Sequence, residues 1–277
     1  MPPAFKFITI SNDKTASKIY DECGVSMVMV DLESKGKASR QPPNSWVSDH
    51  QLSDIQSVKS VLKSAELLVR VDSPPSRDKD QVEKAINGGA DAIMLPYFFS
   101  LDDVRVLNRQ IRSRVPMYLL VETLSAVENL EKILSHFDIE YVHVGLNDLS
   151  IEMGLPFMFQ ALMSKEVDVI AAACSRRGVP FGIGGIARTG MFRPSADLIL
   201  SKHKQLGSKG VILNRSFCKW NSGESHQKYC EVFTKSLKEI DAAIWKWEIA
   251  SNAELAQAEK ELGIFIEQEA EKIAAHK

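Results

Sequence analysis

The chain has few cysteines, and they are far apart in the sequence. Its 277 residues include four, which are Cys23, Cys174, Cys218 and Cys230, and no two form a Cys-x-x-Cys pair. This spacing argues against a zinc cluster and against a disulfide framework. Sparse, widely spaced cysteines fit a protein of a reducing compartment.

An excess of charge of one sign and long apolar stretches are also missing. Lys and Arg total 34 against 36 Asp and Glu, so no overall field would attract nucleic acid or an anionic membrane. No segment is apolar over the length that spans a bilayer, and the start lacks the apolar stretch of a signal peptide. These absences predict a cytoplasmic protein that binds small molecules and binds neither nucleic acid nor a membrane.

Short apolar runs alternate with segments of helical periodicity along most of the chain. Near-continuous apolar strands separated by helices indicate parallel strands covered on both faces. Eight such units predict an α/β fold of the (β/α)8 TIM-barrel type, which takes about 250 residues. An open doubly wound sheet is the alternative, but no Gly-x-Gly-x-x-Gly turn follows an early strand. The predicted strands are 5–10, 26–31, 67–71, 92–95, 117–121, 141–144, 180–183 and 211–213.

Two carboxylates follow two consecutive predicted strands. Glu122 ends the run that begins at Met117, and Asp148 follows the strand 141–144. The C-terminal ends of the strands form the rim where α/β barrels keep their chemistry. Each carboxylate alone would also suit a helix cap. Their equivalent places on neighbouring strands predict instead that they bind one divalent cation together.

The chain changes character after the last predicted strand. Apolar residues from Phe233 to Trp247 recur at spacings of three and four, the pattern of an amphipathic helix. Ser251 and Glu254 then match a capping box, which predicts the start of a second helix with an apolar stripe.

We therefore expect a barrel domain over residues 1–224 and a C-terminal helical extension over 225–277. The first of the two helices can close the barrel. The second has no strand left to cover, so its apolar side predicts contact with a neighbouring subunit. Folding back over the bottom of the barrel is the alternative.

Four segments carry motifs in a fixed order along the chain. They are Leu67-Leu-Val-Arg70-Val-Asp, Gly88-Gly-Ala-Asp-Ala-Ile-Met-Leu-Pro96, Val121-Glu-Thr-Leu-Ser-Ala-Val-Glu-Asn129 and Val144-Gly-Leu-Asn-Asp-Leu-Ser150. These segments resemble the successive motifs of the HpcH/HpaI aldolase and citrate lyase family. The resemblance implies a metal-dependent class II aldolase or lyase on a (β/α)8 barrel, acting next to a pyruvate- or acetyl-type enolate. It also implies a homo-oligomer, a hexamer or a trimer, because many members exchange a helix between subunits.

The resemblance also implies roles for single residues. Glu122 and Asp148 would hold Mg2+, with Mn2+ or Co2+ as alternatives, and would leave coordination positions open for a 2-oxo acid. Arg70 would share the oxyanion charge, a salt bridge at the rim being its structural alternative. Gly145 and Asn147 of the fourth motif would contact the substrate.

The segment after the second predicted strand departs from the family. Aldolases of the HpaI branch have Asp-x-Glu-His there, and the histidine is the general base. This chain has Asp31-Leu-Glu33-Ser34, with serine in the place of that histidine. Citrate-lyase-like branches have Asp-Leu-Glu-Asp, which the segment resembles in part. We expect Asp31 and Glu33 to belong to the site.

The identity of the general base stays open, because an unassisted serine is not basic near neutral pH. His50 is a candidate, since its side chain titrates in this range, although a surface-loop histidine would look the same. A metal-bound water is another candidate, because coordination lowers its pKa. Lys35 and Lys37 could bind substrate anions or orient a water.

A second polar cluster follows the last two predicted strands. It includes Gly185 and Arg188 in one segment and Arg215 in the other. Loops at these places often bind phosphate in α/β barrels, and a Gly-rich turn with arginines suits an anion such as a sugar acid. Close packing by the glycines and solvated arginines are the alternative.

The combined prediction is a divalent-metal-dependent carbon–carbon lyase or aldolase that acts on a 2-oxo acid through a pyruvate-type enolate. An aldehyde would be the second small-molecule partner, and a sugar-acid or polysaccharide-related substrate would fit the second polar cluster. A citrate-lyase-like enzyme for an acyl-CoA hydroxy acid is one alternative. A catalytically inactive barrel that binds a sugar acid or a partner protein is another, and Ser34 motivates it.

Overall fold

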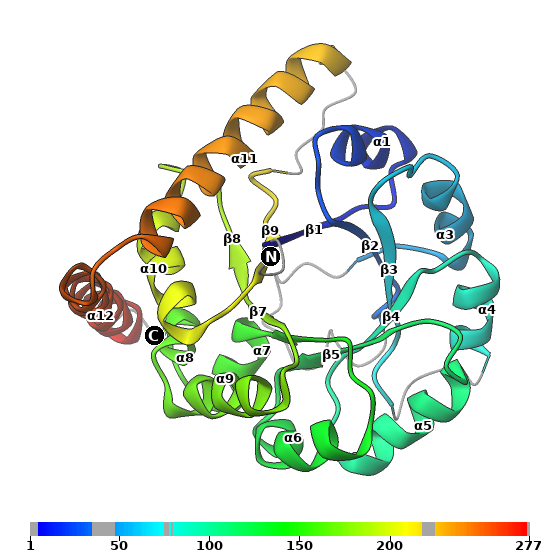
Figure 1. Cartoon of the computed structure of the whole chain (residues 1–277), viewed down its shortest axis with the longest axis horizontal. Coiled ribbons are helices and arrows are strands. Elements are labelled where there is room, and N and C mark those ends of the chain that lie inside the picture. Colours follow the sequence, from blue (N-terminus) through cyan, green and yellow to red (C-terminus); the bar gives the residue numbers. More distant parts are fainter. Residues whose placement is uncertain (1–4, 35–47, 75–77, 79, 218–224, 276–277) are drawn as a thin grey trace.

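Parallel strands form a central ring that helices enclose (Figure 1). The computed structural model describes residues 5–34, 48–74, 78, 80–217 and 225–275. The strands are β1 Lys6–Ile10, β2 Met27–Asp31, β3 Glu66–Arg70, β4 Ala92–Leu95, β5 Met117–Val121, β6 Tyr141–Val144, β7 Phe181–Ile183, β8 Gly185–Ile186 and β9 Gly210–Leu213. The helices are α1 Lys14–Glu22, α3 Leu52–Lys59, α4 Gln81–Asn87, α5 Leu101–Ile111, α6 Leu124–His136, α7 Leu146–Glu152, α8 Phe159–Leu162, α9 Lys165–Arg177, α10 Ala196–Leu206, α11 His226–Glu248 and α12 Asn252–Ala275.

The predicted barrel is confirmed, with one difference at its seventh strand. That strand is split in two at Gly184, where φ is +52°. The first piece, β7, pairs with β6, and the second, β8, pairs with β9. The ring closes there through single hydrogen bonds, from Lys209 N to Phe181 O at 2.7 Å and from Ile212 N to Gly184 O at 3.2 Å. Only glycine adopts this left-handed conformation freely, so Gly184 is the joint of the barrel.

Both faces of the strands are buried, as their near-continuous apolar sequences require. Alternate side chains fill the interior of the ring, among them Ile8, Met29, Leu68 and Tyr118. The intervening side chains pack outward under the helices in a second, larger core. This packing fixes the strands, so the residues that follow each strand have a rigid base on one rim.

Helix α11 closes the barrel between α1 and α10, as the sequence predicts (Figure 1). The hydroxyl oxygens of Tyr20 in α1 and Tyr229 in α11 lie 3.2 Å apart. At the other end of α11, the Trp247 indole N–H donates to the Asp197 carbonyl oxygen at 2.8 Å. The predicted capping box is also confirmed, since Glu254 accepts from the backbone N–H of Ser251 at 2.8 Å.

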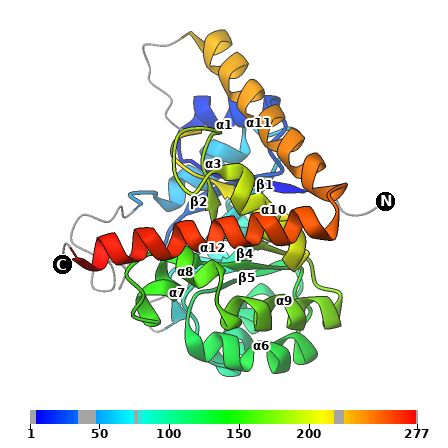
Figure 2. The same cartoon turned by 90° about the vertical axis from the view of Figure 1, so that its left-hand side faces the viewer.

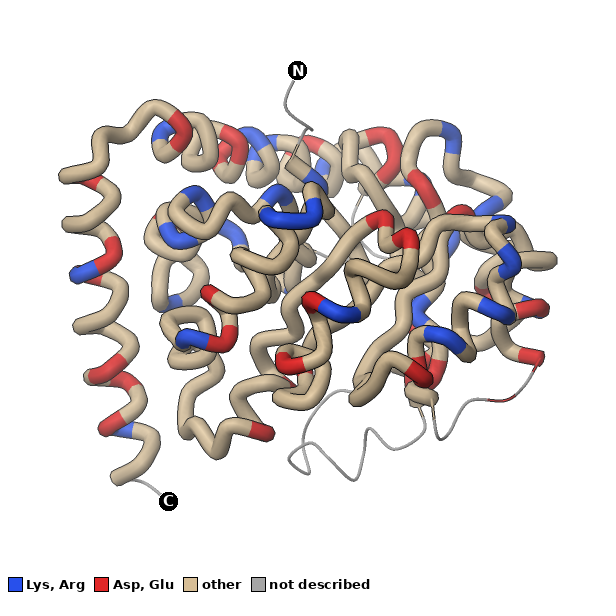
Figure 3. Tube along the Cα trace, turned by 60° about the horizontal axis from the view of Figure 1, so that its bottom comes forward, with Lys and Arg blue, Asp and Glu red and all other residues tan. Residues whose placement is uncertain are grey.

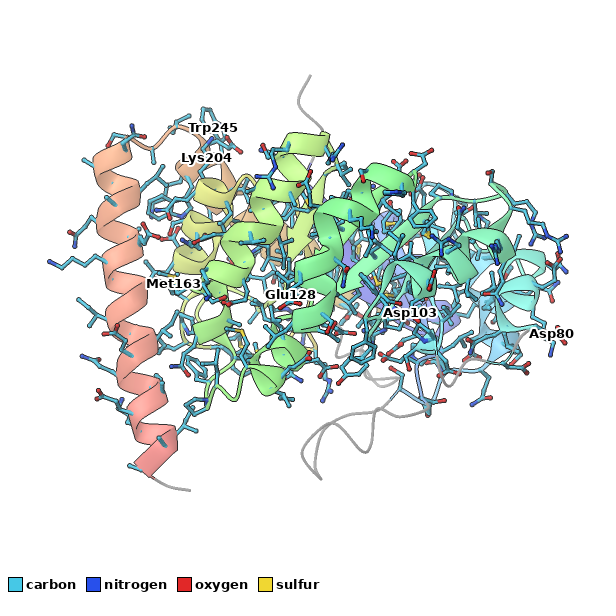
Figure 4. The ribbon with its side chains drawn as sticks, turned by 90° about the horizontal axis from the view of Figure 1, so that it is seen from below. Asp80, Asp103, Glu128, Met163, Lys204 and Trp245 are labelled. Carbon is cyan, nitrogen blue, oxygen red and sulfur yellow. The ribbon has the colours of Figure 1, made fainter. Side chains whose placement is uncertain are left out.

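Helix α12 lies across α10 and α8 of its own chain (Figure 2). Leu262 and Ile266 are buried on this face. Lys202 of α10 forms an ion pair with Glu259 at 2.7 Å. The labelled Met163 lies beside α12 (Figure 4), with its Cε 3.9 Å from the position a Cβ would take at Gly263. The expectation that α12 has no surface to cover within its own subunit is therefore wrong, although α12 lies against the side of the barrel, not over its bottom. Contact with a neighbouring subunit stays a prediction.

Acidic and basic residues are interspersed over the helices (Figure 3), as the balanced composition predicts. Within the described residues, none of the helices is both long and apolar enough to cross a membrane.

The packing of α12 can be tested with two residues of similar size on its opposite sides. Leu262→Ala should lower the free energy of unfolding by about 2–5 kcal/mol, because the side chain is fully buried and leaves a cavity. Ile264→Ala should change it by less than about 1 kcal/mol, because Ile264 is 47% exposed. Urea denaturation of both variants measures the difference. Equal effects would contradict the position of α12 described here.

Candidate active site

Arg70 and Asp31 form an ion pair at the C-terminal ends of two neighbouring strands. The two residues are paired in the β2–β3 register, so their side chains leave the sheet side by side. Arg70 donates from Nε to Asp31 Oδ1 and from Nη2 to Asp31 Oδ2, both at 2.7 Å. Asp31 also accepts a 2.5 Å hydrogen bond from the Ser48 hydroxyl. This bidentate contact fixes the plane of the guanidinium group.

The environment keeps Arg70 charged although its side chain is buried. Burial alone would lower its pKa, but the carboxylates of Asp31 and Glu33 outweigh burial and raise it. Glu33 Oε2 lies 3.6 Å from Arg70 Nε. The remaining nitrogen, Nη1, makes no hydrogen bond to any residue that the structure describes. Arg70 can therefore direct a permanent donor toward a ligand.

Glu122, directly after β5, is held by a backbone N–H of the loop after β4. Its Oε1 accepts from the backbone N–H of Tyr97 at 2.9 Å. Tyr97 has a φ of +42°, a strained conformation for a non-glycine residue of the kind found at functional sites. A Cβ at Gly145 would lie 2.6 Å from Glu122 Oε2, so only glycine leaves room for this carboxylate.

Asp148 lies in the first turn of α7, directly after β6. Asn147 Nδ2 donates to Asp148 Oδ1 at 3.2 Å, and the Asp148 side chain is almost fully buried. Neither acidic residue caps a helix, which was the alternative role for both. Thr123, and not Glu122, caps α6, while the N-cap of α7 is Gly145, which has no side chain.

These groups line one cavity of about 190 Å3 at the C-terminal ends of the strands. Arg70, Glu122 and Asp148 contribute its charged groups, and Asn147, Gly145 and Gly185 lie on its wall. The structure thus brings together six residues that the sequence analysis singled out separately. Asp31 and Glu33 do not line the cavity, but they hold Arg70, which does.

His143 also lines the cavity, and the sequence analysis missed it. Its Nε2 lies 2.9 Å from the carbonyl oxygen of Gly184. Since a carbonyl only accepts, Nε2 carries the hydrogen and Nδ1 carries the lone pair. Nδ1 is buried without a hydrogen-bond partner among the described residues. The sequence did contain a signal for His143. Side chains alternate between the two faces of a strand, so His143 lies on the same inward face as Tyr141.

Burial lowers the pKa of His143 to about 4, and the positive charge of Arg70 adds to the effect. His143 is therefore neutral at neutral pH, with its tautomer set by Gly184. It differs from an ordinary titrating histidine, whose pKa is near 6.5.

The structure places His50 behind Asp31 and outside the cavity lining. Its Nδ1 accepts the backbone N–H of Asp31 at 2.9 Å, so Nε2 carries the hydrogen of the neutral ring. Burial lowers the pKa of His50, while the neighbouring carboxylate of Asp31 works in the opposite direction. Lys35 and Lys37 lie outside the described residues.

The second polar cluster is only partly at the cavity. Gly185 lines it, whereas Arg188 and Arg215 do not. Arg188 packs on the Phe217 ring, with 5.6 Å between its Cζ and the ring centroid, and donates from Nη2 to the Phe217 carbonyl oxygen at 3.1 Å. Arg215 is exposed. Neither arginine therefore contributes to the cavity wall.

The buried neutral state of His143 predicts an acid-dependent loss of stability. The unfolded chain binds a proton at this residue near pH 6.5, whereas the folded chain does so only near pH 4. The free energy of unfolding should thus be unaffected by this group above pH 6.5 and fall as the pH drops toward 4, by up to roughly 3 kcal/mol.

His143→Phe should make this acid-induced loss smaller, because no group is left there to protonate. Part of the loss should remain, since burial also lowers the pKa of His203, to about 3. His136→Gln is the matched control, because His136 is exposed. Urea titrations at pH 7 and pH 4.5 provide the comparison, and an equally acid-sensitive His143→Phe variant would contradict the assignment.

Comparison with known proteins gives a consistent result. The model of the HpcH/HpaI aldolase/citrate lyase family matches residues 6–182. A curated relative is the 4-hydroxy-4-methyl-2-oxoglutarate aldolase cghB of Chaetomium globosum, which is 32% identical over 84 residues. That match covers 30% of this chain and 30% of the relative, so the chain spans less than a third of the relative's length.

Solved structures share the fold at low sequence identity. An HpcH/HpaI aldolase from Desulfitobacterium hafniense DCB-2 matches with a TM-score of 0.60 and 18% identity, over 85% of this chain and 93% of the other. Macrophomate synthase matches with a TM-score of 0.56 and 15% identity, over 90% and 86%. Because the family model spans more than half of the sequence, the chain belongs to the HpcH/HpaI aldolase/citrate lyase family.

Proposed function

We propose that this protein is a divalent-metal-dependent aldolase or carbon–carbon lyase that acts on a 2-oxo acid and releases or adds pyruvate. One observation carries the proposal, namely that Glu122, Asp148 and Arg70 line the same small cavity. Two carboxylates can bind a hard cation, and a guanidinium group opposite them can bind the substrate's anionic oxygens. An aldehyde is the second product or substrate.

The residues at the cavity fit a divalent cation. Glu122 and Asp148 both line the cavity, and carboxylate oxygens are ligands that hard divalent cations prefer. Gly145 has no side chain that would displace Glu122 Oε2, so the carboxylate can stay in one position. Among the described residues no group of three or more His, Cys, Asp or Glu side chains is arranged to hold a metal. Glu122 and Asp148 would therefore be its protein ligands, with Mg2+ as the first choice and Mn2+ or Co2+ as alternatives.

Arg70 would stabilise the enolate that carbon–carbon cleavage produces. Asp31 holds Nε and Nη2, so Nη1 keeps a fixed direction relative to the cavity. A donor fixed in advance stabilises developing charge without having to reorganise during the reaction. When bound, a divalent ion would supply Lewis-acid activation of the ketone and of a water molecule.

The proton of the substrate hydroxyl needs an acceptor other than the two histidines near the site. His50 has its Nδ1 lone pair engaged by the backbone of Asp31. His143 is a weak base because its pKa lies near 4. A bound divalent ion would lower the pKa of a water molecule in the cavity, and this activated water is the remaining candidate for the proton acceptor.

The size of the cavity bears on the alternatives. A volume of about 190 Å3 is smaller than that of pockets for drug-sized ligands, and so it favours a short oxo acid over an acyl-CoA substrate. An inactive barrel would not need a guanidinium group held by two hydrogen bonds beside two carboxylates. A sugar-acid substrate would have to extend outside the cavity to contact Arg188, which does not line it.

Removing the carboxylate charge of Glu122 or Asp148 should weaken metal binding. Glu122→Gln and Asp148→Asn should each lower the Mn2+ affinity by about tenfold or more, because ligand mutations exceed the 10–100-fold effects seen for their supporting residues. Gly145→Ala should act in the same direction by displacing Glu122, whereas Gly263→Ala in α12 should have no effect. Calorimetric titration with Mn2+ measures all four variants. Unchanged affinity in both carboxylate variants would refute the metal site.

Deuterium exchange of the pyruvate methyl group tests the chemistry. If the site forms an enolate, the protein should exchange these protons in D2O with a divalent metal and without an aldehyde. Arg70→Ala should slow the exchange by about 100-fold or more, the effect of removing a preorganised donor to an oxyanion. Arg114→Ala is the control, because Arg114 forms a pair with Glu83 on the surface. Pyruvate binding without exchange in the unaltered protein would favour the inactive barrel.

A further inference from the structure

Two cysteines that are 207 residues apart in sequence lie next to each other in the fold. Cys23 follows the last residue of α1, and Cys230 lies near the start of α11. Their Sγ atoms are 3.0 Å apart. Both are free thiols, and a disulfide bond would require a separation of about 2.0 Å. The sequence spacing alone argued against any disulfide, because it did not reveal this approach.

The packing of α1 against α11 holds the two sulfur atoms in place. The ring centroids of Tyr20 and Phe233 are 5.1 Å apart, and those of Tyr20 and Tyr229 are 6.3 Å apart. All three rings are buried. The approach of the thiols is therefore a consequence of core packing, and closing the last 1 Å or so requires only a small movement of side chains.

The pair is accessible from solvent. Both cysteines are partly exposed, and Cys230 lines a groove of about 800 Å3 along α11 together with Thr234. The Thr234 hydroxyl donates to the Cys23 sulfur at 3.4 Å. Cys174, in contrast, is completely buried in the core. A small reagent can therefore reach the pair but not Cys174.

We propose that Cys23 and Cys230 are an oxidation site, at which exchange with a low-molecular-weight disulfide forms an intramolecular disulfide between α1 and α11. The exchange has two steps. The Cys230 thiolate attacks the small disulfide, forms a mixed disulfide and releases one thiol. The Cys23 thiolate then attacks the Cys230 sulfur, forms the intramolecular bond and releases the second thiol. The protein loses two protons and two electrons, which reduce the small disulfide to two thiols.

The order of the two steps follows from the surroundings of the sulfurs. Burial raises the pKa of Cys23 to about 12, so Cys23 is a poor first nucleophile. Cys230 faces the groove and meets the reagent first. Cys23 acts as the resolving thiol, because the mixed disulfide forms within contact distance of it.

The crosslink would join α1, the first helix of the barrel, to α11, the helix that closes it. The loop between residues 23 and 230 contains every strand from β2 to β9. Closing so long a loop restricts the unfolded chain strongly. The oxidised protein should therefore unfold at a higher temperature than the reduced one. Neither cysteine lines the candidate active site, so this inference does not depend on the proposed function.

The test is equilibration of the full-length protein with oxidised and reduced glutathione. The unaltered protein should lose the thiols of Cys23 and Cys230, and its melting temperature should rise by about 5 °C or more. Mass spectrometry of the unreduced tryptic digest should show the peptides of Cys23 and Cys230 joined.

Serine variants make the assignment specific. Cys230→Ser should show no intramolecular crosslink and no rise in melting temperature, and Cys23→Ser should stop at the mixed disulfide with glutathione. Cys174→Ser should behave like the unaltered protein. Retention of all four thiols in oxidised glutathione, or a crosslink that involves a different pair, would overturn the proposal.

Discussion

Two charged side chains that stand side by side at the ends of β2 and β3 organise the rim of this barrel. Asp31 and Arg70 are both buried, and a buried ion pair is stable only when its remaining hydrogen-bonding groups are satisfied. Here the two bonds between them and the Ser48 hydroxyl meet that need on the Asp31 side. The remaining guanidinium nitrogen of Arg70, Nη1, has a fixed direction because Asp31 holds Nε and Nη2. Removing Asp31 would thus leave a buried positive charge without its main partner and would also release the direction of Arg70.

Much of the barrel could be predicted because its strands are apolar on both faces. Runs such as 117–121 and 141–144 are too short and too apolar for surface helices, and the strands lie where these runs are. The positions of Glu122 and Asp148 after neighbouring strands were informative for the same reason, since parallel strands end on one rim. A pattern of this kind depends only on local sequence and a known architecture, so it can be recognised from the sequence.

The parts that could not be predicted depend on contacts between distant segments. The alternation of β6 gave no hint that the Gly184 carbonyl would meet His143. Tyr97 contributes a backbone N–H to Glu122, and a backbone group has no residue type that marks it. His50 was a candidate base because its side chain titrates near neutral pH, yet its Nδ1 accepts the backbone N–H of Asp31. The apolar stripe of α12 indicated that this face is buried but did not identify the surface that covers it. Most of that surface belongs to α10 of the same chain.

The break between β7 and β8 has a consequence for how such a barrel can contain a cavity at all. A closed ring of parallel strands normally fills its own interior, and the layers around Met29 and Leu68 do so here. At Gly184 the chain changes partners from β6 to β9, and the same residue lies on the cavity wall. A side chain there would collide with Leu146, whose Cδ1 is 2.7 Å from the position of a Cβ. One wall of the site is therefore formed where the backbone passes from one half-strand to the other, while the layers below stay packed.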